Sequence, residues 1–413
     1  MTAILVACGS PVRPTVQDAP EPHTVSNGGQ YVPSQGFLAD VAATNAFMDT
    51  RPRVERPLRV TGLESVPGIG SMSVEACEGC HPTIAAEWRQ SIHAQAWIDP
   101  QFQGELAKSD NRWLCVNCHT PLLIQQDRLP VAIVDGDVEQ PRWVKNERFD
   151  AALRDEGLNC AGCHVREDGI HGPGLENSQA PHGVIVDARF RSDADDPMCL
   201  DCHQAELVYE GKSFVCTFQT GAEWRAGPYD DEGKACGHCH QPRVKRPAAV
   251  GGPVREVGRH WFKGSGIPKF ADRPWGPETL PGPGLEVEAQ RGADGLEVTA
   301  TNANAGHWLP SGDPERWVQV TATFRDASGA GLGAEAQRFG QTWQWSTPPV
   351  KVGDNRLKPR ESRTWTWPVP SGAVNAEIVA STHRISKANA EYHGLGDYPR
   401  AIETQRFTVS VAP

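Results

Sequence analysis

The sequence predicts two structural parts, a mostly α-helical or irregular domain followed by an immunoglobulin-like antiparallel β-sandwich. Three observations lead to this prediction. A Cys-x-x-Cys-His motif occurs five times between residues 77 and 240, and helix signals in the same region are short. Beyond residue 284, apolar residues recur with a period of two, which is typical of strands with one buried face. A length of 413 residues leaves room for two or three domains.

The five motifs are the most specific feature of the chain. Two thiols at this spacing reach the two vinyl groups of one haem, and the histidine that follows becomes an axial ligand of its iron. Five copies therefore predict a pentahaem domain with five covalently bound haem c groups. The predicted attachment residues are Cys77, Cys80, Cys115, Cys118, Cys160, Cys163, Cys199, Cys202, Cys236 and Cys239. The predicted motif ligands are His81, His119, His164, His203 and His240.

Two other uses of paired cysteines agree less well with the sequence. A structural zinc site would bring two pairs to one ion and would not need a histidine directly after every pair. A disulfide within each pair would close only a very short loop and would add little stability. Hydrophobic residues make up only 38% of the chain, which is low for this length. Apolar haem groups would supply the missing core.

The formal net charge of −11 bears on possible partners. An acidic chain of this kind is not expected to bind nucleic acid. We expect redox partner proteins instead, either other cytochromes or a membrane electron-transfer complex, for which an acidic surface offers a docking face.

Residues 1–8 resemble the remnant of a lipoprotein signal peptide. Residues 5–9 are similar to a bacterial lipobox, in which Cys8 would receive lipid after cleavage. The stretch has no basic region and too short an apolar run, so we expect the true start to lie upstream. The alternative is that Cys8 is unrelated to lipidation. Because c-type cytochromes mature outside the cytoplasm, we expect a lipid-anchored protein of the bacterial periplasm or outer-membrane surface.

The chain before the β-sandwich divides into a tether and the pentahaem domain. Residues 9–70 are rich in Pro, Gly, Ser and Thr and predict an irregular tether. Within it, residues 37–48 have helical spacing and are expected to dock on the next domain. Residues 71–273 hold all five motifs, with the clearest helix over residues 82–96. A stretch rich in Pro and Gly, residues 274–284, marks the boundary that follows.

Residues 284–413 are predicted to form the β-sandwich, because short alternating segments are separated by hairpin-type turns. Two of these strands carry alternating tryptophans, which are expected to fill the sandwich core or its contact with the pentahaem domain. The predicted strands cover residues 285–290, 296–302, 317–325, 338–345, 363–369, 376–382 and 405–411. The tryptophans are Trp343, Trp345, Trp365 and Trp367.

Each haem iron needs a second axial ligand or stays open on one side. Histidine is favoured over methionine, which occurs at only three internal positions. A lone histidine is usually a packing or surface residue, but five irons raise the expectation of ligation. The predicted second ligands are His93, His182, His260, His307 and, as the fifth, His171. Of the remaining histidines, His23 lies in the tether, His238 lies between two attachment cysteines, and His383 and His393 are spare candidates.

Three segments resemble known multihaem proteins. Cys77-x-x-Cys-His-Pro followed by Trp88-x-x-Ser-x-His93 is similar to the family of hydroxylamine oxidoreductase and its tetrahaem electron acceptor. The segment His260-Trp-Phe-x-Gly resembles the distal-ligand segments of that superfamily. Gly306-His307-x-x-Pro-Ser-Gly is similar to C-terminal β modules of multihaem cytochromes. The resemblance covers about residues 71–270 plus this β motif, and it implies haems in parallel-stacked and perpendicular pairs.

The number of haem irons that have two axial protein ligands distinguishes between two possible functions. If every iron carries two histidines, the chain is an electron carrier, which the supply of histidines favours. The alternative is a multihaem oxidoreductase with one open haem that acts on a small nitrogen or sulfur oxyanion. The resemblance gives this alternative little support, because no motif has lysine in place of histidine. Tyr209 and Tyr229, the tyrosines that could approach a haem, are expected to be packing residues, and no catalytic residue is predicted.

Two further features are expected to be structural. Cys216 is flanked by aromatic residues and predicts a buried thiol. The basic cluster of Lys245, Arg246 and Arg259 is predicted to be a solvated face.

Overall fold

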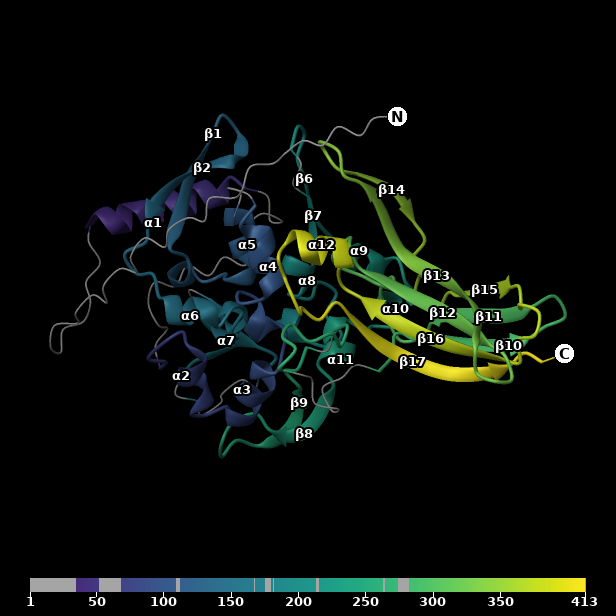
Figure 1. Cartoon of the computed structure of the whole chain (residues 1–413). Helices are drawn as coiled ribbons and strands as arrows, with labels where there is room; N and C mark the ends of the chain where they lie inside the picture. The colour runs from purple at the N-terminus through teal and green to yellow at the C-terminus, as the bar shows by residue number, and fades with distance from the viewer. Residues whose placement is uncertain are drawn as a thin grey trace.

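The computed structural model describes residues 35–51, 68–108, 112–166, 168–174, 180, 182–212, 215–262, 264–273 and 282–412. The predicted lipobox with Cys8, His23 and most of the predicted tether lie outside these residues. We call residues 68–273 the motif domain, because they hold all five motifs, and residues 282–412 the β domain. Figure 1 shows the β domain extending from one side of the motif domain.

The motif domain combines short helices with small sheets. Its helices are α2 (Val74–Glu78), α3 (Pro82–Arg89), α4 (Pro100–Leu106), α5 (Arg112–His119), α6 (Ala151–Asp155), α7 (Cys160–His164), α8 (Leu200–His203), α9 (Thr220–Arg225), α10 (Pro228–Asp231) and α11 (Cys236–His240). Single 3-10 turns are η2 (His93–Gln95), η3 (Leu123–Gln125) and η4 (Ala188–Phe190). The predicted helix over residues 82–96 is thus α3 followed by η2.

The small sheets of the motif domain correct the prediction of a mostly α-helical or irregular fold. The two longest of these strands each contain a proline, which argues against a strand in the sequence, and the others have at most five residues. Three hairpins pair β1 (Arg128–Val134) with β2 (Asp137–Lys145), β6 (Gln204–Val208) with β7 (Val215–Gln219), and β8 (Arg243–Pro247) with β9 (Val254–Gly258). A further sheet consists of β3 (Val165–Arg166), β4 (Gly169–Gly172) and β5 (Val184–Val186).

The helix α1 (Gln35–Asp49) packs against the motif domain, as its apolar spacing predicted. Phe37 and Val41 are buried in one cluster with Leu123 and Leu129. This part of the predicted tether is therefore a docked helix, and Figure 1 shows it alongside β1 and β2.

The β domain consists of two antiparallel sheets that share one hydrophobic cluster. Burial alternates along β11 and β12, so that every second side chain enters this cluster. One sheet has the order β10 (Leu285–Arg291), β11 (Leu296–Asn302), β15 (Ser362–Trp367). The other has the order β14 (Val350–Asp354), β13 (Gly331–Gln344), β12 (Trp317–Arg325), β16 (Asn375–His383), β17 (Ala401–Ser410), and α12 (Lys387–Tyr392) connects the last two strands. All seven predicted strands are present, and β14 is an additional one.

The four tryptophans of the β domain have two different environments. Trp367 is buried in the hydrophobic cluster, and Trp365 packs against it. Trp343 and Trp345 stack on each other, but Trp345 is 58% exposed. Trp365 and Trp367 thus fill the β-domain core, one of the two predicted alternatives, whereas Trp345 lies outside that core. Beyond Gly340, β13 pairs only with β14 and leaves the region where the two sheets overlap.

Buried charged residues join the two domains. Nη1 of Arg356, in the β domain, donates to Oε1 of Glu223 in α9 at 2.5 Å, and both side chains are at most 5% exposed. The Tyr398 hydroxyl donates to Oδ1 of Asp99 at 2.9 Å and accepts from Nη1 of Arg384 at 2.8 Å. Because an unpaired buried charge is costly, these contacts hold the β domain in one position against the motif domain.

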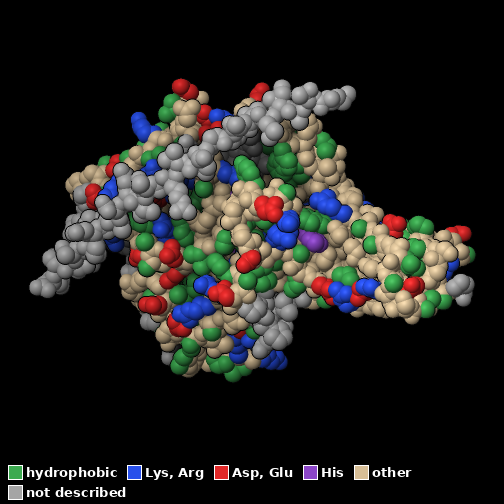
Figure 2. Space-filling view, viewed as in Figure 1, with side chains coloured by type: hydrophobic (Ala, Val, Ile, Leu, Met, Phe, Trp, Pro, Cys, Tyr) green, Lys and Arg blue, Asp and Glu red, His purple; other side chains and the backbone are tan. Residues whose placement is uncertain are grey.

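The surface shows no separation of charge by sign on the face seen in Figure 2, where acidic and basic side chains are interspersed. Within the described ranges, no helix is both long enough and apolar enough to cross a bilayer.

Candidate haem sites

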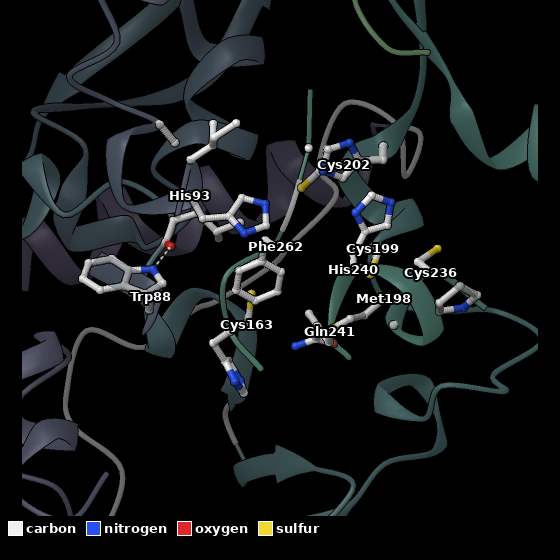
Figure 3. A pocket seen from close by; sticks show the side chains of 18 of the residues that line it. Trp88, His93, Cys163, Met198, Cys199, Cys202, Cys236, His240, Gln241 and Phe262 are labelled. Atoms are coloured by element: carbon white, nitrogen blue, oxygen red, sulfur yellow. Dashed lines mark hydrogen bonds between the residues drawn. The ribbon is translucent and has the colours of Figure 1, made fainter. Parts of the chain in front are cut away.

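One large cavity lies in the motif domain and reaches the β domain. Its volume is about 2390 Å³, whereas a pocket for one drug-sized molecule measures about 300–1,000 Å³. The cysteines and histidines of all five motifs line its wall. Figure 3 shows part of this lining, with His93, Cys199, Cys202, Cys236 and His240 around one open space. The size and lining fit several large cofactors attached through these cysteines.

The motifs fold locally as helical turns. The third and fifth motifs are the helices α7 and α11, and the His203 N–H of the fourth motif donates to the Cys199 carbonyl at 2.9 Å. Residues three apart on a helix lie on the same face, so the two cysteines of a motif project together and the histidine follows beside them. This local geometry is the one that attachment of both thiols to one haem needs.

Four of the five motif histidines face a second histidine at nearly the same distance. Metal–imidazole bonds are about 2.0 Å long, so two rings on opposite sides of one metal ion have centres about 6.3 Å apart. The observed separations of the ring centres match this value. They are 6.4 Å for His81 and His182, 6.3 Å for His93 and His203, 6.4 Å for His164 and His260, and 6.3 Å for His240 and His307.

Backbone carbonyls lie beside the Nδ1 atoms of five histidines in the cavity, four of them members of these pairs. Because a carbonyl only accepts a hydrogen bond, Nδ1 carries the proton and Nε2 is free to bind a metal. The distances between Nδ1 and the carbonyl oxygen are 2.6–3.0 Å. The pairs are His81 with Ala248 (2.7 Å), His119 with Ala96 (2.6 Å), His164 with His171 (2.6 Å), His260 with Gly258 (3.0 Å) and His307 with Trp308 (2.9 Å).

Burial keeps the cavity histidines neutral. Desolvation, together with neighbouring histidines, lowers the pKa of His93 to about 3. Burial likewise lowers the pKa values of His119, His203, His260 and His307 to about 4. The neutral imidazole is the form that binds a metal, so the cavity favours ligation over protonation.

His307 comes from the β domain. It lies in the loop between β11 and β12, where Nδ2 of the fully buried Asn302 donates to the His307 carbonyl at 2.9 Å and to the Leu357 carbonyl at 3.1 Å. The β-domain core therefore positions a histidine opposite the fifth motif.

Glu87 in α3 is a positioning residue that the sequence did not reveal. Its carboxylate accepts hydrogen bonds from Arg246, Arg259 and the backbone N–H of His260 at 2.6–2.9 Å. Burial alone would raise the pKa of Glu87, but these hydrogen bonds lower it below its ordinary value. The prediction of a solvated basic face is wrong for Arg246 and Arg259, because both bind this buried carboxylate. Glu87 thereby holds the backbone of His260 in place.

The second motif differs from the other four. Phe102 of α4 stacks on the His119 ring, with centres 3.6 Å apart and an angle of 6° between the planes. Within the described residues, no second histidine faces His119 at the separation seen in the four pairs.

His171 is placed differently from the other predicted ligands. Its Nε2 lies 2.8 Å from Oδ1 of Asp168 and its Nδ1 lies 3.1 Å from Oδ2 of Asp187. Both ring nitrogens are thus held by carboxylates, and only the His171 carbonyl contacts a motif histidine, His164.

The spare histidines also have protein partners or face solvent. His383 stacks on Trp317, His393 contacts Lys108 and Glu105, and His238 is exposed. Cys216 lies in β7 beside the Trp113 cluster.

Contacts between cysteines show which motifs are neighbours in space. The thiols of Cys77 and Cys160 are in hydrogen-bonding contact, and so are those of Cys118 and Cys202 and those of Cys199 and Cys236. The first motif therefore adjoins the third, and the fourth adjoins both the second and the fifth. Among the described residues, no three His, Cys, Asp or Glu side chains group as ligands of a bare metal ion, which the zinc alternative requires.

The comparisons with known proteins agree with the motifs on the class of protein. A family model described as "Cytochrome c554 and c-prime" matches residues 76–134, which include the first two motifs. No curated protein sequence matches the chain. Together with the motifs and the fold, the family match supports a multihaem c-type cytochrome.

One solved structure resembles almost the whole fold. It is the crystal structure of a penta-heme cytochrome c552 from Thermochromatium tepidum, with a TM-score of 0.57 and 18% sequence identity. The similarity covers 82% of this chain and 98% of that chain. The resemblance to hydroxylamine oxidoreductase stays a prediction.

Proposed function

We propose that this chain transfers electrons through five covalently bound haem c groups, four of which are held between two histidines. The observation that carries the proposal is the common separation of 6.3–6.4 Å in the four histidine pairs. An iron with two histidine ligands has no free position for a substrate, so it exchanges electrons without binding small molecules. His171 is left out of the proposed ligand set, because carboxylates hold both of its ring nitrogens.

The cysteine contacts support a continuous path between the haems. The first and third motifs adjoin, as do the second and fourth and the fourth and fifth. The charge on Cys199 also acts on Cys163, so the third motif lies near the fourth. In the proposed path, the fourth haem connects the haems of the first and third motifs with those of the second and fifth.

A second function is favoured by one observation: among the described residues, no second histidine faces His119 at the separation of the four pairs. In this proposal the second-motif haem has one open side, and the chain is an oxidoreductase that acts there on a small nitrogen or sulfur oxyanion. The closed haems would then supply or remove its electrons.

The surroundings of this function are also proposals. We propose a location in the bacterial periplasm or on the outer-membrane surface, with a lipid anchor at Cys8 and other cytochromes or a membrane electron-transfer complex as partners. For the β domain we propose an immunoglobulin-like sandwich, because two antiparallel sheets share one hydrophobic cluster.

Spectroscopy on the purified holoprotein tests both functions. We expect an intact mass that includes five haems, low-spin spectra for four of them, and carbon monoxide binding by one reduced haem per chain. Five low-spin haems without carbon monoxide binding would exclude the second function. Binding at two or more haems would contradict the four histidine pairs.

A further inference from the structure

The hairpin of β8 and β9 carries an excess of positive charge. Residues 241–259, which we call the basic hairpin, contain five Arg or Lys residues and one acidic residue, in a chain whose formal net charge is −11. Two of the five bind the buried Glu87. Of the other three, Arg243 and Lys245 are exposed on one face of β8, and Arg255 in β9 is half-buried. An excess of positive charge therefore remains at the surface here.

The loop of the basic hairpin exposes apolar residues. Val250 is 72% exposed and Val254 is 68% exposed, more than any other valine, leucine or isoleucine among the described residues. Figure 1 places this hairpin at the lower end of the motif domain, and Figure 2 shows hydrophobic and basic side chains together at that end. An apolar centre beside charged side chains is a common composition of a protein–protein contact.

The same loop touches the first motif. The Val250 N–H donates to the Cys80 carbonyl at 2.8 Å, and the Ala248 carbonyl oxygen lies 2.7 Å from Nδ1 of His81. Cys80 is one of two exposed motif cysteines, and the other eight are partly buried. On the proposed attachment, the haem edge bonded to Cys80 lies next to the exposed valines.

The first motif is also one end of the proposed electron path. It adjoins the third motif through the contact of Cys77 with Cys160, and the third lies near the fourth. The other exposed motif cysteine, Cys239, belongs to the fifth motif at a different end of the path. Because electron transfer slows steeply with distance, a partner protein exchanges electrons fastest with a haem whose edge is near the surface.

We propose that the basic hairpin is the docking surface of an acidic redox protein that exchanges electrons with the first-motif haem. This inference rests on the electron-transfer function proposed above and adds where one partner binds and which charge it carries. Opposite charges steer the two proteins together, and the net negative charge of the rest of the chain repels the partner from other faces. Val250 and Val254 supply the apolar centre of a small, transient contact.

The test uses reduced flavodoxin, a small acidic redox protein, as the electron donor to the oxidised holoprotein. In each encounter flavodoxin hydroquinone is oxidised to its semiquinone, and one ferric haem is reduced to the ferrous form. Stopped-flow haem absorption measures the second-order rate. At an ionic strength of about 0.1 M, the double variant Arg243→Glu with Lys245→Glu should react at least about tenfold more slowly than the unmodified protein. The rate of the unmodified protein should fall as salt is added.

A matched variant separates docking from net charge. Arg142 and Lys145 are exposed in β2, and Figure 1 shows this strand at the opposite end of the motif domain from β8 and β9. The double variant Arg142→Glu with Lys145→Glu changes the net charge equally but should slow the reaction by less than about threefold, because distant charges are screened. Photoreduced lumiflavin, a small uncharged reductant, should reduce all three proteins at the same rate.

The outcomes separate this inference from the function on which it rests. If photoreduced lumiflavin does not reduce the haems, the electron-transfer function itself is overturned. If lumiflavin reduces them, equal rates of flavodoxin with the two double variants, or a flavodoxin rate that salt does not lower, would overturn only the docking surface. Sedimentation velocity tests a second copy of the chain as the occupant. A dimer that dissociates in the variant Arg243→Glu with Lys245→Glu would assign the hairpin to that copy and overturn the acidic redox partner.

Discussion

Replacing His307 with alanine tests the proposed ligation directly. His307 and His240 face each other with ring centres 6.3 Å apart and an angle of 9° between the planes. Removing one ring opens one side of one iron, so carbon monoxide binding should rise from one to two equivalents per chain. Asn302 binds the backbone carbonyl of His307 and not its ring, so the hydrogen bond that positions the loop remains available in the variant. The assay is a carbon monoxide titration of the reduced holoprotein, scaled to its measured haem content.

A matched control variant detects carbon monoxide binding that results from general destabilisation of the structure. His171→Ala removes a histidine that is also partly buried and lines the same cavity but is bound by Asp168 and Asp187. We expect its stoichiometry to stay at one. One equivalent in His307→Ala, or two in His171→Ala, would refute the pairing read from the ring separations.

Three further predictions concern stability. Phe324→Ala, at a side chain only 1% exposed in the β-domain core, should lower the free energy of unfolding by about 3–5 kcal/mol. The control Val352→Ala, at a 58% exposed side chain, should change it by less than about 0.5 kcal/mol. Denaturant titrations followed by circular dichroism measure both. Arg356→Met leaves the buried Glu223 without a cation and also removes the contacts of Arg356 with Asp354, so it should cost about 3–5 kcal/mol. The double variant with Glu223→Leu should recover the part that is due to Glu223, in the same titrations. Because burial raises the pKa of Glu315 in the folded state, folding retains a proton that the unfolded chain releases, and stability falls as pH rises through the window from 4.5 to about 7. Glu315→Gln should therefore melt at a higher temperature than the unmodified protein at pH 8, and this difference should vanish near pH 4; an equal difference at both pH values would contradict the raised pKa.

The sequence predicted which histidines are candidate ligands better than it predicted which histidines face each other. The motif spacing is local, so Cys-x-x-Cys-His predicts its own geometry within one helical turn. The opposing histidines are set by tertiary structure. His93 follows the first motif closely in the sequence but faces His203 of the fourth, and sequence distance carries no signal of this pairing. His171 has suitable surroundings in sequence, yet Asp168 and Asp187 occupy its ring nitrogens.

The fold was predictable where one face of a strand is buried. In β11 and β12 the alternation of buried and exposed side chains reproduces the apolar period in the sequence, and both predicted ranges match the observed strands. The strands of the motif domain lack this signal, because the two longest contain a proline and the others have at most five residues. Glu87 was not predicted either, since its partners Arg246 and Arg259 come from a distant hairpin segment.

The position of His307 in the chain has a consequence for how the protein matures. His307 follows all five attachment motifs in the sequence and belongs to a domain that ends only with the last residues described. During synthesis from the N-terminus, the fifth motif emerges before His307 does. On the proposed ligation, the fifth haem can be attached while its iron is still open, and completion of the β domain is the step that closes it. A chain truncated before residue 282 would then retain all five covalent attachments but carry a reactive fifth iron.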